Sequence, residues 1–375
     1  MTPIELTHNR FITAALRNRW PQFIIRSIAL AGFVFAIIAG LIGTPVGSHN
    51  FAIVFVWIAW WAVLVLIAVP ILGRGWCSIC PIPMPGEWLQ NGAALGPNKK
   101  GFGLNRRWPK KLRNIWLQNF AFMLLAMFSL VILTTPSVTS IVLLALLLIA
   151  IGTSLLFERR SFCRYLCPVS GFIGLYSQLA PIELRVKDTE VCAAHTEKSC
   201  YIGSADGYGC PWNVYPAALT KNINCGLCLE CLRTCPQDNI SINLRSFGAD
   251  LDQKRGRKLD EAFKAFIMLG SAVVYSAVML GPWGGLKLAA SSIGTSSWLI
   301  YALSFVALIF GVLPTSFLGA VALSRKLSKA TGSVKKTFVA YATALVPLGL
   351  MAWIAFSISF VFTNISYAWS TASDP

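Results

Sequence analysis

Charged residues are scarce in this sequence, and acidic residues are the scarcest of them. Asp, Glu, Lys and Arg make up 13% of the 375 residues, about half of what a soluble domain carries. This shortage excludes an ordinary soluble enzyme. Basic residues outnumber acidic ones by 32 to 15, giving a net charge of +17. The excess flanks apolar runs, which indicates membrane topology and attraction to anionic lipid rather than nucleic-acid binding.

Histidine is also rare, and the positions of the three histidines argue against haem. His8 precedes the first apolar run, His49 lies in a loop, and His195 belongs to a cysteine-rich segment. No pair of them faces another across a bilayer as the axial ligands of haem b would, and the C-x-x-C-H motif of c-type haem is absent. The apolar runs contain no acid pair that would indicate an ion path, which argues against a pump.

Long apolar runs, by contrast, are abundant, and 55% of the residues are hydrophobic. Each run is close to the 20 residues needed to cross a bilayer. Because backbone amides in lipid must be paired within the segment, each run is expected to be a helix. We predict an all-α polytopic membrane bundle of about seven transmembrane helices, at 22–43, 51–72, 115–134, 138–157, 265–281, 298–318 and 338–362.

The distribution of lysine and arginine predicts the orientation. The N-terminal segment and the loops after the second and sixth runs carry most of these residues. The chain is therefore expected in a bacterial-type inner membrane, with its N-terminus on the cytoplasmic side and its C-terminus outside. Residues 158–262 are rich in cysteine and contain no span. They predict an inserted cytoplasmic ferredoxin-like α+β module between membrane domains at 1–157 and 263–375.

Eleven cysteines are too many for a membrane protein without special chemistry. In the cytoplasm such a dense set indicates metal ligands rather than disulfides. Residues 225–236 read Cys-Gly-Leu-Cys-Leu-Glu-Cys-Leu-Arg-Thr-Cys-Pro, the C-x2-C-x2-C-x3-C-P run of bacterial ferredoxins. Paired C-x2-C motifs also bind zinc, but four cysteines this close together and followed by proline favour iron–sulfur.

In a two-cluster ferredoxin the fourth cysteine of such a run ligates the other cluster. The Cys-Pro pair at 210–211 matches the exchanged ligand of the first cluster. The first predicted [4Fe–4S] cluster, cluster A, is therefore assigned to Cys210, Cys225, Cys228 and Cys231. The second, cluster B, is assigned to Cys192, His195, Cys200 and Cys235. The alternative for His195 is a surface position beside a cluster held by three cysteines, with or without an exogenous ligand.

Four cysteines remain, and we call them the membrane-surface group: Cys77, Cys80, Cys163 and Cys167. They form a C-x2-C-P motif after the second span and a C-x3-C-P motif after the fourth. Even-numbered spans end on one side of the membrane, so the four thiolates could hold a third iron–sulfur centre. Two redox-active dithiols, or buried cysteines packed in turns, are the alternatives. The apolar stretch 171–182 is too short to span and is expected to lie flat in the interface, where a quinone head group could bind beside these motifs.

Together these motifs resemble those of the NosR/NapH-type polytopic membrane polyferredoxins. The resemblance rests on G-R-G-W-C…C-P at 73–81, F-C-R-Y-L-C-P at 162–168 and the ferredoxin run, and it covers about residues 73–244. The first pair departs from the family, which usually shows C-x3-C-P there. The resemblance implies a membrane-bound electron-transfer protein, such as a quinol dehydrogenase component, that relays electrons between the quinone pool and a redox protein partner.

The sequence leaves other functions open. An accessory or structural subunit of a larger respiratory membrane complex would also carry clusters and a membrane anchor, and a redox sensor would use the dithiols. No residue is assigned a catalytic role. The expected partners are membrane lipids, a redox protein or larger complex, and quinone, but not nucleic acid.

Overall fold

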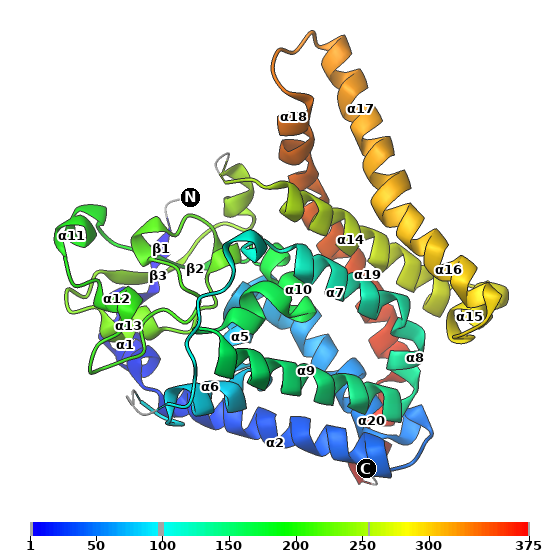
Figure 1. Ribbon diagram of the computed structural model, residues 1–375, viewed down its shortest axis with the longest axis horizontal. Helices are drawn as coiled ribbons and strands as arrows, with labels where there is room; N and C mark the ends of the chain where they lie inside the picture. Colours follow the sequence, from blue (N-terminus) through cyan, green and yellow to red (C-terminus); the bar gives the residue numbers. More distant parts are fainter. Residues whose placement is uncertain (1–2, 97–100, 254–255, 374–375) are drawn as a thin grey trace. The chain divides into compact units, whose positions relative to one another are not determined.

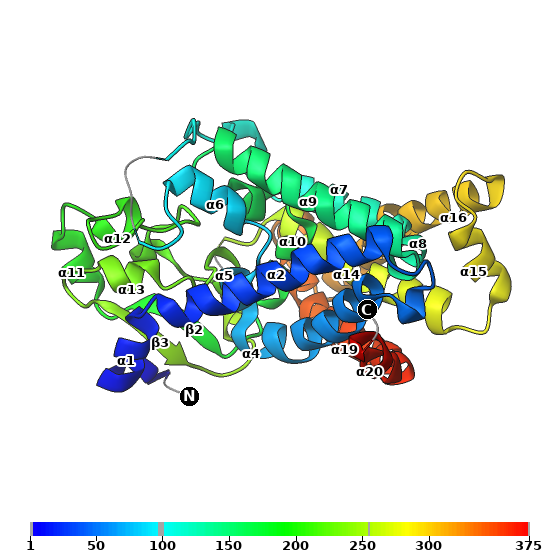
Figure 2. The same ribbon diagram turned by 90° about the horizontal axis from the view of Figure 1, so that it is seen from below.

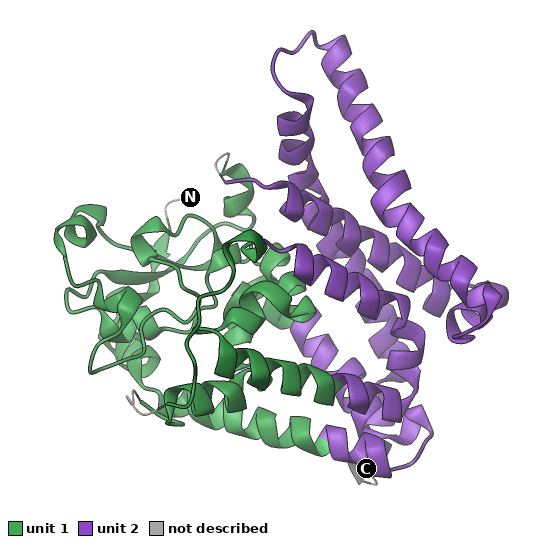
Figure 3. Ribbon diagram, viewed as in Figure 1, with its two compact units in different colours: residues 1–35, 67–113, 143–253 green, residues 36–66, 114–142, 254–375 purple. Residues whose placement is uncertain are grey.

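The computed structural model describes residues 3–96, 101–253 and 256–373. The chain divides into two compact units, and each is built from separate stretches of sequence (Figure 3). Unit 1 comprises residues 1–35, 67–113 and 143–253, and unit 2 comprises residues 36–66, 114–142 and 254–375. All eleven cysteines belong to unit 1. The domain boundaries at 157 and 262 stay a prediction.

Within the described ranges, six helices are long and apolar enough to cross a membrane. This agrees with the prediction of a polytopic helical bundle. The predicted span at 115–134 is not one of them, because its helix stops at Phe128, where φ is −96° and ψ is 6°. The break contains neither proline nor glycine, so the sequence pattern did not signal it. The six helices are Trp20–Ile42, Phe51–Ile79, Pro136–Leu156, Leu259–Leu280, Ser296–Leu327 and Val334–Asn364.

Unit 2 is helical, and α14 (Leu259–Tyr275) lies side by side with α19 (Leu345–Asn364) in both views (Figures 1 and 2). The indole of Trp353 on α19 donates to the carbonyl of Met268 at 2.9 Å. Helix α14 begins six residues before the predicted span, which brings the buried Lys264 into it. The other main helices are α7 (Trp116–Met127), α8 (Ser129–Thr134), α15 (Gly284–Ser291), α16 (Ser296–Ala307), α17 (Leu313–Leu327), α18 (Val334–Tyr341) and α20 (Ser366–Ser373).

Unit 1 contains a small antiparallel sheet with the strand order β1-β3-β2. The N-terminal strand β1 (Ile4–Glu5) pairs with β3 (Ile240–Leu244), placing Ile4 opposite Leu244. On its other edge β3 pairs with β2 (Ile182–Val186) along all five residues. Leu184, Ile240 and Ile242 from this sheet form a core with Cys200 and Cys231. The sheet therefore packs directly against the predicted cluster ligands.

Short helices carry the cysteine motifs of unit 1. Helix α10 (Pro168–Tyr176) follows Cys167 and was expected to lie flat in the membrane interface. Instead almost all of its side chains are buried inside unit 1, so that expectation is wrong. The other helices used below are α1 (Arg10–Arg17), α2 (Trp20–Ile42), α5 (Trp76–Ile79), α6 (Met84–Asn91), α9 (Pro136–Leu156), α11 (Thr189–Ala194), α12 (Ser199–Ile202) and α13 (Glu230–Thr234).

Candidate iron–sulfur sites

The two Cys-Pro motifs of the membrane-surface group come together in unit 1. Burial raises the pKa of the Cys163 thiol well above its usual value, and the nearby thiols of Cys167, Cys77 and Cys80 raise it further. Burial likewise raises the pKa of Cys80 to about 12, with contributions from Cys77 and Cys167. Since Cys163 interacts with the other three thiols, four residues separated by up to ninety positions in sequence form one neighbourhood.

Helix ends position these thiols. Cys77 lies on α5 and Cys80 caps its C-terminal end, with Pro81 following. Cys167 caps the N-terminal end of α10, where its sulfur accepts a hydrogen bond from the backbone N–H of Ser170 at 3.3 Å. Proline is suited to the first turn of a helix. The backbone N–H groups of that turn have no partner within the helix, so proline, which lacks an N–H, loses no hydrogen bond there. Pro168 therefore begins α10 directly after Cys167, whereas Pro81 follows the end of α5.

Buried charged side chains contact the backbone of this group. Arg160 donates to the carbonyl of Cys77 at 2.8 Å and forms an ion pair with Glu87 on α6. Arg26 on α2 binds the same carboxylate at 2.6 Å. Burial alone would raise the pKa of Glu87, but Arg160 and Arg26 outweigh burial and hold that pKa below its usual 4.5. Arg26 thus has a structural partner in Glu87.

Replacing Glu87 with Gln should destabilise the protein by about 3–5 kcal/mol, because Arg160 would stay buried without its carboxylate. The folded-state pKa of Glu87 lies below its unfolded value, so its stabilisation is present above pH 4.5 and is lost as the pH falls below that value. Unfolding temperatures of the purified protein between pH 7 and pH 4 would measure both effects. The exposed Glu190→Gln is the matched control. Equal stability of E87Q and the unmodified protein would contradict the prediction.

The cysteines assigned to cluster A line one cavity, together with apolar side chains that include Leu184 and Leu219. The cavity measures about 20 Å³. Burial raises the pKa of Cys231 well above its usual value, and the other three thiols raise it further. The four cysteines that line the cavity are Cys210, Cys225, Cys228 and Cys231.

The loop that carries Cys225 and Cys228 has an unusual backbone. Leu227 and Leu229 both lie in the left-handed region, with φ of 46° and 65°, which side chains adopt at an energetic cost that the surroundings must offset. Gly226 has no room for a side chain, because a Cβ there would overlap the indole nitrogen of Trp212. The glycine of the motif therefore permits a close approach, which fits a loop wrapped around a cofactor.

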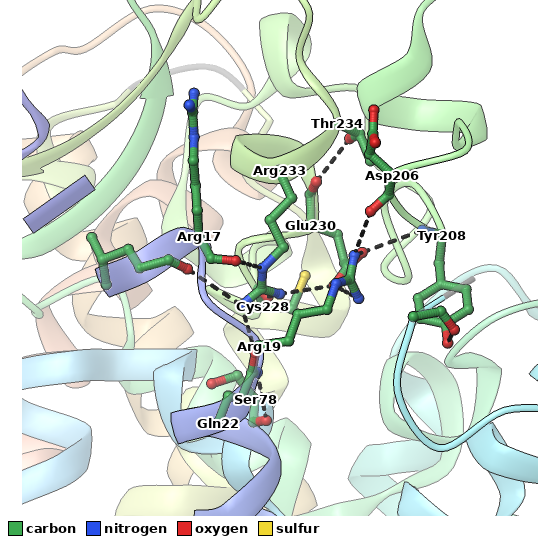
Figure 4. A network of polar contacts seen from close by, with 12 residues as sticks. Arg17, Arg19, Gln22, Ser78, Asp206, Tyr208, Cys228, Glu230, Arg233 and Thr234 are labelled. Carbon is green, nitrogen blue, oxygen red and sulfur yellow. Dashed lines mark hydrogen bonds and ion pairs between the residues drawn. The ribbon is translucent and has the colours of Figure 1, made fainter. Parts of the chain in front are cut away.

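Arginines from the N-terminal segment bind this loop (Figure 4). Glu230, at the start of α13, accepts hydrogen bonds from Arg19 at 3.1 and 3.0 Å and from Arg233 at 2.8 Å. Arg233 also donates to the carbonyls of Cys228 at 3.2 Å and Arg17 at 3.0 Å. The charge pattern of the N-terminal segment, which includes Arg17 and Arg19, predicts a role in membrane topology only. In the structure this segment forms hydrogen bonds with the residues that follow the loop of cluster A.

Three of the four residues assigned to cluster B are neighbours. Burial raises the pKa of Cys200 to about 11, and the nearby Cys235 and Cys192 contribute. Asn239 joins two of these thiols, donating from its side chain to Cys192 at 3.2 Å and from its backbone to Cys235 at 3.4 Å. Sequence reasoning missed Asn239, and its only signal was its position four residues after the last cysteine. His195 lies half-buried at the C-terminal end of α11.

In the part of the chain that the structure describes, no three or more His, Cys, Asp or Glu side chains are close enough to share a single metal ion. Thiolates on one zinc ion lie about 3.8 Å apart, because each Zn–S bond is about 2.3 Å. A [4Fe–4S] cluster imposes a wider spacing since each thiolate binds a different iron. The donors present, buried thiols with apolar walls and a glycine loop, suit such a cluster.

Comparison with known proteins bears on the membrane-surface group first. A family model described as "4Fe-4S binding domain" matches residues 53–103 and 139–187. The matched residues include all four membrane-surface cysteines and none of those assigned to clusters A and B. The six apolar helices define the class of the chain, a polytopic helical membrane protein, and the match adds a region similar to a 4Fe–4S binding domain.

A particular relative is the "Putative electron transport protein YccM" of Escherichia coli (strain K12), which is 26% identical over 133 residues. The aligned region is 34% of this chain and 34% of the relative, so the chain spans about a third of the curated relative it matches. No solved structure matches. The narrower resemblance to NosR/NapH-type polyferredoxins stays a prediction, as do the number of clusters and the inserted ferredoxin module.

Proposed function

We propose that this chain is a membrane-bound iron–sulfur electron-transfer protein that relays single electrons between the quinone pool and a redox protein partner. The observation that carries the proposal is the gathering of eleven cysteines in unit 1 into three neighbourhoods. One of these coincides with the matched 4Fe–4S binding domain. The name of the YccM relative describes an electron transport protein, which supports the same role here.

The proposed ligand sets are those of cluster A, cluster B and the membrane-surface group. The last set is the best supported, since the family match and the mutual proximity of its thiols agree. Bound clusters would supply one-electron redox chemistry. The protein's own residues hold the thiolates, exclude water and set the local charge, which together determine cluster potentials. The basic flanking segments support a bacterial inner-membrane location with the N-terminus and clusters in the cytoplasm and the C-terminus outside.

Iron and sulfide analysis with EPR on anaerobically purified protein tests the cofactor content. Three clusters correspond to about twelve irons per chain, whereas clusters A and B alone correspond to about eight. The relay is tested by reducing the protein with dithionite and adding a water-soluble quinone analogue, which should reoxidise the clusters. Clusters that stay reduced would instead favour an accessory or structural subunit.

The assignment of His195 makes a separate prediction about cluster B. Neutral imidazole raises a cluster's potential relative to thiolate, as it does in Rieske centres. His195→Cys should therefore lower the midpoint potential of one cluster and leave the others in place, as measured by EPR-monitored redox titration. An unchanged set of potentials would show that His195 is not a ligand and that cluster B is held by three cysteines.

A further inference from the structure

The indole N–H of Trp212 is a buried donor that lacks a hydrogen-bond partner among the described residues. The side chain is 2% exposed, so bulk water does not replace the missing partner. Buried polar groups are nearly always hydrogen-bonded in native proteins, and an exception requires an explanation. Tryptophan can only donate, so the explanation must be an acceptor.

The indole ring lines the same cavity as the four cysteines assigned to cluster A. Its nitrogen lies against Gly226, so closely that a Cβ at that position would overlap it. Gly226 is one of the two residues between the first two ligands of the ferredoxin run, Cys225 and Cys228. The unpartnered donor is therefore aimed at the loop that surrounds the proposed cluster.

Residues from the two Cys-Pro motifs hold the ring in this orientation. Arg164 donates to the carbonyl of Trp212 at 2.6 Å and to the next carbonyl, that of Asn213, at 3.1 Å. The guanidinium of Arg74 stacks over the indole at 4.5 Å, and it is anchored by the carbonyl of Ser170 at 2.9 Å. A ring fixed at its backbone and on its face cannot easily turn its N–H to another partner.

We propose that Trp212 is a cluster-tuning residue whose indole N–H donates a hydrogen bond to a sulfur of cluster A. This inference rests on the proposed function, because it needs a cluster on Cys210, Cys225, Cys228 and Cys231. Reduction adds one electron to the cluster, and a donor to sulfur stabilises the more negative form. Hydrogen bonds to cluster sulfurs are among the factors that set the potential. The bond therefore raises the potential of cluster A.

The stacked Arg74 gives the same arrangement a second effect. Arg74 belongs to the first Cys-Pro motif, and Trp212 lies against the loop of cluster A. One rigid pair of side chains thus joins the membrane-surface group to cluster A. A positive charge at this place favours negative charge on either side of it.

Isotope labelling tests the hydrogen bond without any substitution. The full-length protein is produced with ¹⁵N-indole tryptophan, purified anaerobically and reduced, and examined by pulsed EPR. A ¹⁵N coupling to a reduced cluster is expected, and it should vanish in Trp212→Phe. A cluster A signal without any ¹⁵N coupling overturns the inference while leaving the proposed function intact. Absence of the cluster signal itself would instead overturn the proposed function.

The redox consequence is measured on the Trp212→Phe variant, which removes the donor but keeps an aromatic ring beneath Arg74. At a fixed potential, the reduced-to-oxidised ratio of cluster A should fall about tenfold, equivalent to about 59 mV for a one-electron couple. Trp20→Phe, on an exposed side chain of unit 1, is the matched control and should leave the ratio unchanged. An unchanged ratio in the Trp212 variant overturns the inference. If this variant does not assemble, the labelling experiment decides.

Discussion

Replacing Cys163 with alanine will lower the iron content of the anaerobically purified protein by about four atoms per chain and remove one EPR species. The reason is that Cys163 lies among the thiols of Cys77, Cys80 and Cys167, within the matched 4Fe–4S binding domain. A cluster that loses one of its four buried thiolates loses one of its protein ligands. Colorimetric iron and sulfide analysis with EPR measures the loss.

The matched substitution Cys231→Ala should remove a different set of about four irons, because Cys231 belongs to the cavity of cluster A. The two variants together should lose both EPR species and retain the third. Unchanged iron in the Cys163 variant would contradict a third cluster. It would favour two dithiols or cysteines that merely pack in turns.

Gly226→Ala should abolish cluster A while leaving the membrane-surface group loaded. The added methyl group would overlap the indole nitrogen of Trp212, and that ring is buried and held by Arg74 and Arg164. Displacing the ring would cost more free energy than moving the loop, so the loop that carries Cys225 and Cys228 must shift instead. EPR of the reduced variant and its iron content measure the loss.

Gly152→Ala is the matched control for this prediction, since a Cβ at Gly152 on α9 meets no atom within 4 Å. Alanine in a helix interior is also favoured over glycine by roughly 0.5–1 kcal/mol, so the control should assemble normally. Gly226→Ala protein with a complete set of clusters would show that Trp212 can move aside, contrary to the prediction.

Local spacing made part of this architecture predictable. The ferredoxin run and the Cys-Pro pairs constrain ligands within a few residues of one another, and the structure groups the cysteines of each proposed set. The apolar runs likewise identified six of the helices, because hydrophobic length is a local property. The sequence did not predict the interruption at Phe128. Breaks in helices are usually recognised by proline or glycine, and neither residue occurs there.

Non-local contacts were beyond the reach of the sequence. Trp212, Asn239 and the Arg160–Glu87 pair become recognisable only when distant segments meet, and no periodicity or motif marks them. The predicted interfacial position of the apolar stretch after Cys167 was wrong for a related reason. A short apolar helix has the same pattern whether it covers a membrane surface or lies inside a protein core, and α10 lies in the core.

The pairing of β1 with β3 has a consequence for the order of biosynthesis. Residues 4 and 5 pair with residues 244 and 243, so they are synthesised long before the strand that they join. At roughly 5–20 residues per second, the ribosome needs about 12–48 s to supply that strand. Strand β1 therefore stays without its partner until β3 has been made, and this sheet forms only after residue 244 has been translated.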